Sequence, residues 1–404
     1  MRPCTVGEQG EHRGTALRIV FYTHVFAPSV GGVETLLMSL ALCLNGRATR
    51  RADEKVEVTV LTPHPARDFD DRGLPFRVVR EPGPAQIVEW FGKADIVHLA
   101  GPSFVPLLAA LAMRRRVVVS HHGFQAACPN GQFYYRPTAT LCPGHFRAGR
   151  HMECLKCNAE NGGWHSWLIW LATFPRRMLC QRAAVNVAPT RWLATVLGLP
   201  RTEVVPHGVA QGSAGRTAKS PARPTISFVG RLVSTKGVNV LIAAAQRLKA
   251  KGQSFHLQVI GEGPEREALE ASAKHGGLNG TVEFVGYMTP DEIEQALAKS
   301  VAVVAPSLAG EVFGLTAAQS MMAGRAVVTS DIGALHEVRG DTGLSFPAGD
   351  AEALAERLET LLKTPGLASQ LGEQARARAE KLYNMERMVN EHLRIYEEVV
   401  SRAG

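Results

Sequence analysis

The chain has 404 residues, of which 45% are hydrophobic and 20% charged, a composition that excludes disordered and fibrous proteins. A single hydrophobic core rarely grows beyond about 250 to 300 residues, so we expect two domains. Residues 1–16 contain no apolar run of the secretory kind, and no apolar run reaches the ~18 residues that a spanning helix needs. We therefore expect a cytoplasmic protein.

The net charge of +8 is distributed unevenly. Residues 1–204 contain 24 Lys and Arg against 15 Asp and Glu, whereas the remainder contains 21 against 22. A basic half could bind nucleic acid, but the sequence contains no recognised nucleic-acid module, so we expect no such partner. An anionic membrane surface, with the protein peripheral on the inner face of the cell membrane, or a diphosphate-bearing acceptor fits the charge better.

In the first half, short β-branched runs alternate with helical patterns. The runs expected as strands are residues 17–22, 56–61, 76–79, 95–100, 116–122 and 185–189. Strands that alternate with helices predict a parallel, doubly wound sheet. Gly31 and Gly32 open the first helix, and they form a glycine turn at the end of the strand–helix unit where a phosphate can approach.

The run at 116–122 ends in two histidines. Ligands of open α/β sheets bind outside the carboxyl ends of the strands, so we expect a histidine at this strand end, His121 or His122, to face a cleft. The alternative for either residue is a histidine that caps the strand or lies in the core.

Four cysteines follow the histidines, in a segment where the pattern indicates little regular structure. They are Cys128, Cys142, Cys154 and Cys157. The last two form a Cys-x2-Cys pair, and four thiolates suit a structural zinc ion or an iron–sulfur cluster. The alternative is four reduced cysteines in a loop, since a cytoplasmic chain keeps its thiols reduced.

Residues 164–179 combine three tryptophans with Arg176 and Arg177. This composition is typical of a segment that lies at a membrane interface. A buried helix is the alternative interpretation.

After a Gly- and Ser-rich joint, a second series of strands and helices begins. Its expected strands are residues 225–230, 257–261, 282–286, 301–306 and 325–330, and a helical pattern runs from Met385 to Val400. Between the last two strands, Gly310 and Gly314 allow sharp turns before a helix expected at 315–322. Amides at such a helix start favour an anion, so this loop predicts a phosphate site.

These segments resemble the retaining nucleotide-sugar glycosyltransferases of family 4. The family's Glu-x7-Glu signature is matched by Glu311-Val312-Phe313-Gly314-Leu315, with Gln319 at the place of the second Glu. Val229-Gly230-Arg231-Leu232 with Lys236-Gly237, Gly261-Glu262-Gly263-Pro264, Thr342-Gly343-Leu344 and Pro347-Ala348-Gly349-Asp350 match further family elements. The resemblance covers about residues 17 to 400.

The resemblance implies the GT-B fold, with two Rossmann-like domains that face each other across a cleft. The expected parts are a disordered tail at 1–16, an acceptor domain at 17–205 with a cysteine-rich insertion at 124–160, a linker at 206–224, a donor domain at 225–384 and a helix at 385–404 that crosses back to the first domain. A similar cysteine-rich insertion occurs in a subset of the family.

The implied activity is retaining transfer of a sugar from a nucleotide-diphosphate sugar to a glycan or lipid-linked acceptor, without a required cofactor. By resemblance, His122 contacts the donor sugar and Glu311 holds its hydroxyl groups. The implied donor-binding positions are Gly31, Gly32, Arg231, Lys236, Phe313, Gly314, Leu315 and Gln319. A carboxylate-pair hydrolase is disfavoured because the motif retains only Glu311.

Three positions depart from the family pattern. Gln319 replaces a Glu and loses a charge-assisted hydrogen bond, Gly123 stands where many members have Asp, and His207 stands where members usually have Asn. These departures leave a second hypothesis open, that of a non-catalytic protein of the same fold that binds nucleotide sugars or activates a partner.

Overall fold

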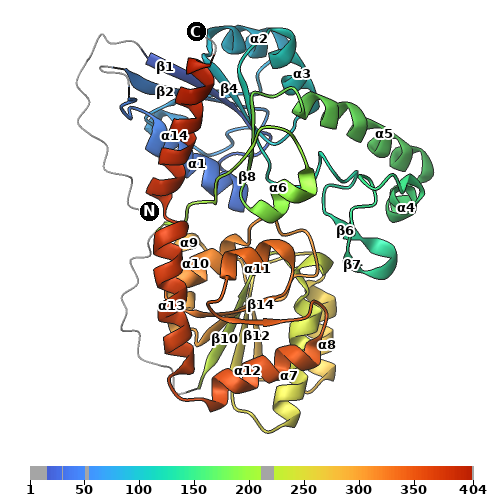
Figure 1. Cartoon of the computed structure of the whole chain (residues 1–404). Coiled ribbons are helices and arrows are strands. Elements are labelled where there is room, and N and C mark those ends of the chain that lie inside the picture. Colours follow the sequence, from blue (N-terminus) through green and yellow to red (C-terminus); the bar gives the residue numbers. More distant parts are fainter. Residues whose placement is uncertain (1–15, 30, 51–53, 211–222, 403–404) are drawn as a thin grey trace. The chain divides into compact units, whose positions relative to one another are not determined.

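The chain forms two compact units, which Figure 1 shows. The computed structural model describes residues 16–29, 31–50, 54–210 and 223–402. The first unit comprises the residues up to Gly131, Gly144–Gly208 and the segment from Met385; the second comprises Gln132–Pro143 and Val209–Asn384. The tail expected at 1–16, apart from its last residue, and most of the expected linker at 206–224 lie outside the described residues.

The first unit is built on a seven-stranded parallel sheet with the strand order β3-β2-β1-β4-β5-β8-β9. Its strands are β1 (Ala16–Tyr22), β2 (Lys55–Thr62), β3 (Arg77–Arg80), β4 (Ile96–Ala100), β5 (Val117–Ser120), β8 (Val185–Ala188) and β9 (Thr202–Val204). Its helices are α1 (Gly32–Leu44), α2 (Pro84–Lys93), α3 (Phe104–Ala112), α4 (His151–Cys157), α5 (Gly163–Cys180), α6 (Arg191–Leu197) and α14 (Met385–Ser401). The central strands β4 and β5 are buried along almost their whole length and are apolar except for His98 and Ser120, as expected for strands that helices cover on both faces.

The last helix of the chain belongs to the first unit. α14 packs beside α1, and Met388, Val389 and Tyr396 enter the same apolar core as Leu36 and Leu40 of α1 (Figure 1). One face of α14 is apolar at helical spacing, which explains why it pairs with the sheet through that face.

A hydrogen-bond chain ties α14 to the sheet. The Tyr396 hydroxyl lies 2.5 Å from Nδ1 of His98 on β4, and Nε2 of His98 lies 2.7 Å from the Ser120 hydroxyl on β5. All three side chains are buried, so these bonds satisfy polar groups that would otherwise lose contact with water at a cost.

The second unit contains a six-stranded parallel sheet with the order β12-β11-β10-β13-β14-β15. Its strands are β10 (Thr225–Val229), β11 (His256–Ile260), β12 (Val282–Gly286), β13 (Ala302–Ala305), β14 (Ala326–Ser330) and β15 (Leu344–Phe346). Its helices are α7 (Val238–Ala250), α8 (Arg266–His275), α9 (Pro290–Lys299), α10 (Leu315–Met322), α11 (Gly333–Arg339), α12 (Ala351–Lys363) and α13 (Leu367–Leu382). The predicted class, α/β with two doubly wound parallel sheets, is confirmed.

The chain reverses its direction of progress across this sheet between two adjacent strands. From β10 it moves outward through β11 to β12, and it then returns to the other side of β10 with β13. Such a reversal is a topological switch point, and ligands of open α/β sheets bind at the carboxyl ends of the strands there, here β10 and β13.

The cysteine-rich segment has more regular structure than expected. Residues 134–141 form a small antiparallel hairpin of β6 (Tyr134–Tyr135) and β7 (Thr140–Leu141), which groups with the second unit. Cys154 and Cys157 stand on α4, and α5 follows directly. The expectation of an irregular segment is therefore wrong for these two cysteines.

The segment expected at 164–179 is helical and forms most of α5. The alternative interpretation of a buried helix is wrong, because the side chains of Trp164 and Trp167 are 78% and 52% exposed. None of the helices in the described ranges is both long enough and apolar enough to cross a membrane.

Candidate functional site

The predicted donor residues of the second unit gather at the point where its sheet reverses direction. Arg231 and Lys236 lie in the loop after β10, and Glu311 lies in the loop after β13, the strand beside β10. The two loops are joined by a backbone hydrogen bond of 2.8 Å from the Leu308 amide to the Thr235 carbonyl. Lys236 and Glu311, which are 75 positions apart in the sequence, are thus neighbours in the structure.

Lys236 and Glu311 form an ion pair between Nζ and Oε1. The Ser307 hydroxyl donates a second hydrogen bond of 2.8 Å to the same carboxylate oxygen. Burial by itself would raise the pKa of Glu311, but the charge of Lys236 and the two hydrogen bonds outweigh burial, so the pKa is lowered. Glu311 is therefore ionised at neutral pH and held in a fixed position.

Glycines allow the two loops to approach closely. Gly237 has a φ of +66°, and a Cβ there would lie 2.0 Å from the carbonyl oxygen of Pro306. Gly314, with a φ of +95°, precedes α10 and has no side chain to cap the helix. Because the first amides of a helix lack partners within it, the start of α10 can bind an anion beside Lys236.

The other predicted donor residues have different environments. Arg231 is exposed at the end of β10, and Gln319 is exposed on α10. The side chain of Phe313 is buried against Tyr383, with ring centroids 5.3 Å apart, so only its backbone is available to a ligand. The donor roles of these three residues, and of Gly314 and Leu315, stay predictions.

Gly31 and Gly32 stand at the start of α1, as expected. The carboxylate of Glu34 folds back toward Gly31, where an added Cβ would lie 2.4 Å from Oε2, and it accepts a hydrogen bond from Ser29. An anion at this helix start would therefore meet a negative charge that the sequence pattern did not reveal. The predicted diphosphate contact at these glycines remains a prediction.

His121 and His122 follow β5; His121 is buried, and His122 is half-buried. His121 Nε2 lies 3.0 Å from the Asn186 side-chain oxygen, whereas both ring nitrogens of His122 are buried with no hydrogen-bond partner among the described residues. Burial lowers the pKa of His122 to about 3, so its ring is neutral at physiological pH. Such a ring can exchange hydrogen bonds with a hydroxyl group.

The His122 ring lines a cavity of about 10 Å³, the size of one water molecule. The His207 ring lines the same cavity, and its centroid lies 5.3 Å from that of His122. Sequence reasoning noted His207 only as a departure from the family pattern. Ser307, which had no signal beyond its place after a strand, was missed.

The structure places the four cysteines only partly together. Cys128 donates a hydrogen bond of 2.9 Å to Asn130, which donates one of 3.4 Å to Cys157, and Cys154 precedes Cys157 by one turn of α4. Within the part of the chain that the structure describes, no three His, Cys, Asp or Glu side chains are arranged to hold a metal ion. The four-cysteine metal site stays a prediction.

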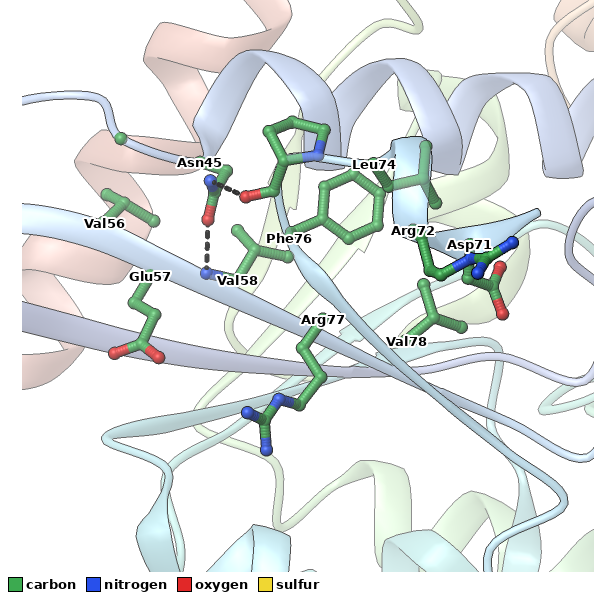
Figure 2. Close-up of a pocket in the computed structure, with 12 residues that line it drawn as sticks. Asn45, Val56, Glu57, Val58, Asp71, Arg72, Leu74, Phe76, Arg77 and Val78 are labelled. Atoms are coloured by element: carbon green, nitrogen blue, oxygen red, sulfur yellow. Dashed lines mark hydrogen bonds between the residues drawn. The ribbon is translucent and has the colours of Figure 1, made fainter. Parts of the chain in front are cut away.

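A larger hollow lies elsewhere in the first unit, as Figure 2 shows. It has a volume of about 610 Å³ and is lined by β2, β3 and the loop between them. Asn45 shapes its wall, since its amide donates to the Pro75 carbonyl at 2.7 Å and its side-chain oxygen accepts from the Val58 amide at 3.0 Å. None of the predicted site residues lines this hollow.

Comparison with known proteins decides the family. Residues 214–378 match the family model described as glycosyl transferases group 1. The chain is also 30% identical over 289 residues to the glycogen synthase of Mycobacterium tuberculosis, an alignment that covers 69% of the chain and 68% of that enzyme. The chain belongs to the group 1 glycosyl transferases.

Other group 1 glycosyl transferases align over shorter segments. The phosphatidyl-myo-inositol mannosyltransferase of Mycolicibacterium smegmatis is 32% identical over 230 residues, which are 55% of the chain and 58% of that enzyme. The chain thus spans just over half the length of this relative. Residues of the second unit supply the family match, in agreement with the place of the Lys236–Glu311 pair.

Solved structures show the same fold. Sucrose-phosphate synthase from Thermosynechococcus elongatus superposes with a TM-score of 0.73 and 20% identity, covering 95% of the chain and 99% of that structure. Anabaena HepE, solved in complex with UDP and glucose, gives a TM-score of 0.70 at 18% identity, covering 95% of the chain and 100% of that structure. These similarities establish the GT-B fold for this group 1 glycosyl transferase.

Proposed function

We propose that the chain transfers a sugar from a nucleotide-diphosphate sugar to a glycan or lipid-linked acceptor, with retention of configuration at the sugar. The observation that carries the proposal is the Lys236–Glu311 pair beside the uncapped start of α10. A fixed cation, a fixed carboxylate and the backbone amides of a helix start suit a ligand with a diphosphate at one end and sugar hydroxyls at the other.

The reaction places negative charge on the departing diphosphate. Groups that face this charge lower the barrier only if they stabilise the transition state more than the bound substrate. Lys236 and Arg231 fit this role, together with the amides from Phe313 to Leu315. Glu311 holds hydroxyls of the donor sugar in this proposal, and Gln319 binds the hydroxyls of the nucleotide ribose.

The acceptor binds in the first unit in this proposal. His122 contacts the donor sugar in this proposal, because both of its ring nitrogens are buried without partners among the described residues, and an unsatisfied buried polar group points to a missing partner, here a hydroxyl of that sugar. The mannosyltransferase relative is named for a phosphatidyl-inositol acceptor, which supports a lipid-borne acceptor on the cytoplasmic face of a membrane. We place the enzyme there as a peripheral protein.

Group 1 glycosyl transferases typically need no cofactor for transfer, and the Lys and Arg of this site perform the neutralising task of a divalent metal. A zinc ion or iron–sulfur cluster at the four cysteines would have a structural role. The thiol donor set suits either group, and Asn130 already links Cys128 to Cys157.

Calorimetric titration with UDP, GDP and ADP tests the donor site directly. We expect one of them to bind, and Arg231→Ala to lower kcat by about 10²-fold, as for a lost donor to a developing anion. Arg72→Ala, which removes an exposed arginine of the first unit, is the matched control. Failure of all three nucleotides to bind at millimolar concentration would refute the proposal.

Nucleotide binding without turnover would support the second hypothesis of a non-catalytic, partner-activating protein. The replacement of the second motif Glu by Gln319 is the observation that favours it. The intact Arg231, Lys236, Glu311 and His122 oppose it, because a protein that only binds a nucleotide sugar has no need of groups that stabilise a departing diphosphate.

A further inference from the structure

Helix α5 presents its apolar side to the solvent. The exposed large apolar side chains of this helix are Trp164, Trp167, Leu168, Leu171, Phe174 and Met178, and we call these six residues the α5 face. At 100° per residue they fall on one continuous stripe of the helix. The opposite stripe, which is buried, carries Ser166, Thr173 and Cys180. A helix that packs on a core normally has the reverse arrangement.

Polar contacts hold the helix in this orientation. The Ser166 hydroxyl donates to the carbonyls of Asn158 and Gly162, the latter at 2.9 Å. Near the other end, the Arg177 guanidinium donates to the Leu197 carbonyl at 2.6 Å and to the Gly198 carbonyl at 2.9 Å. Both ends of α5 are thus fixed without use of the α5 face.

Aromatic rings stiffen part of the face. Trp170 packs edge-on against Trp167 and Phe174, with ring centroids 5.0 Å and 5.1 Å apart, and Phe174 also contacts Phe146 at 4.9 Å. The side chains are therefore already ordered, and their docking costs less conformational entropy than that of mobile chains.

The exposed apolar surface continues onto the helices that pack against α5. Phe104, Val105 and Leu108 on α3 and Met152 on α4 are also exposed. Ten of the thirteen exposed large apolar residues in the described ranges belong to α3, α4 and α5. Figure 1 shows these three helices together at one edge of the first unit. Clustering of this kind marks an interaction surface rather than ordinary surface scatter.

The positive charge of the chain lies in the same stretch of sequence. Residues 101–200 contain 11 Lys and Arg but only 2 Asp and Glu, whereas residues 1–100 contain 12 of each and residues 201–404 contain 22 against 23. Basic residues flank the helices, with Arg114 after α3, Arg150 before α4 and Arg182 after α5, and all three are exposed. The exposed apolar face and the surrounding positive charge therefore both suit the same partner, which is apolar inside and anionic at its surface.

We propose that the α5 face docks on an anionic lipid bilayer, with α5 parallel to the membrane plane and its apolar stripe at the boundary between headgroups and acyl chains. Helices with tryptophan and leucine on one face and arginines around it bind in this way. The proposal rests on the proposed transfer to a membrane-borne acceptor for its biological purpose. Its test measures membrane binding without sugar transfer.

The experiment is co-sedimentation of the full chain with vesicles of phosphatidylcholine, alone or mixed in equal parts with phosphatidylglycerol. We expect binding to the mixed vesicles, with a blue shift of tryptophan fluorescence, and a decrease of binding as salt is added. The triple variant Trp164→Ser, Trp167→Ser, Leu171→Ser should lower the partition coefficient by about tenfold or more, because binding scales with the apolar area inserted.

Tyr287→Ser is the matched control, since Tyr287 is an exposed large side chain that belongs to the second unit and to none of α3, α4 and α5. It should bind vesicles as the unaltered chain does. All altered positions are exposed, so the melting temperatures should agree, and this is measured for each variant.

Three results would overturn the proposal. The first is a chain that stays in the supernatant with the mixed vesicles, and the second is a triple variant that binds as the control does. The third is an unaltered chain that does not bind vesicles and is a dimer in size-exclusion chromatography, together with a triple variant that is a monomer. This result would show that the α5 face binds a second copy of the chain. Nucleotide titration of the same samples separates these results from a failure of the proposed donor site.

Discussion

Replacing Lys236 with methionine removes the cation beside Glu311 while retaining the length of the side chain. The Glu311 side chain is 12% exposed and that of Lys236 is 32% exposed. Loss of one partner of a fully buried pair costs about 3 to 5 kcal/mol, whereas an exposed pair contributes at most about 1 kcal/mol. Because Lys236 is partly solvated, we expect Lys236→Met to lower the free energy of unfolding by about 2 kcal/mol at neutral pH.

The loss of stability caused by Lys236→Met should increase as the pH rises. In the native chain the pKa of Glu311 is lowered, so its contribution to stability is present at neutral pH and lost as the pH falls through that pKa. In the variant, burial is opposed only by the Ser307 hydrogen bond, so the pKa should rise above the unfolded value of about 4.3. The variant then loses stability as the pH rises, and the difference between the two proteins widens from about pH 4 to about pH 7.

Urea denaturation followed by circular dichroism at about pH 4.5 and about pH 7.5 measures this difference. Lys251→Met is the matched control, because Lys251 is 40% exposed and its Nζ lies 3.0 Å from a carboxylate oxygen of Glu359 at the surface. It should cost less than about 1 kcal/mol. An equal loss for Lys236→Met at both pH values, or a loss no greater than that of the control, would refute the reasoning.

Three further predictions follow from other parts of the molecule. Gln319→Glu should tighten nucleotide binding by about 1 kcal/mol, because a neutral hydrogen bond becomes charge-assisted; unchanged affinity in calorimetry would place Gln319 away from the ribose. Acidification from about pH 6.5 to about pH 4 should lower the melting temperature. Burial lowers the pKa of His122 to about 3 and that of His392 to about 4. Over this pH range the unfolded chain therefore binds protons that the folded chain does not, and protonation stabilises the unfolded state. His392→Gln should make that decline shallower, and an identical slope would contradict this account. Elemental analysis of anaerobically purified protein should find about one equivalent of zinc or an iron–sulfur cluster that Cys154→Ser abolishes, and less than about a tenth of an equivalent would leave four thiols without metal.

The regular parts of the fold could be predicted because local sequence and final environment agree there. The helix expected at 315–322 has those bounds in the structure, since Gly314 supplies a left-handed turn just before a run of good helix formers. The strand expected at 116–122 ends earlier, at Ser120; the His121 amide still donates to the Val187 carbonyl of β8, and the chain bends at His122.

Other features could not be predicted from local pattern. The Lys236–Glu311 pair depends on β10 and β13 being neighbours, which is a property of the strand order and not of either loop. In α5, apolar residues occur nearly all round the helix, so periodicity could not tell which side would be buried. The Ser166 hydroxyl bonds to the Asn158 carbonyl outside the helix, and the Thr173 hydroxyl bonds to the Ile169 carbonyl within it, so both polar groups are satisfied on the buried side.

The place of α14 also bears on how the protein is made. Six residues of this helix complete the core that β1, β2 and α1 begin: Met388, Val389, Leu393, Ile395, Tyr396 and Val399. A ribosome synthesises nearly all of the second unit between Gly208 and Met385, so that unit can fold while the first still lacks one wall of its core. Until α14 emerges, the part of the core that this helix covers stays exposed to water, which favours aggregation of the nascent first unit.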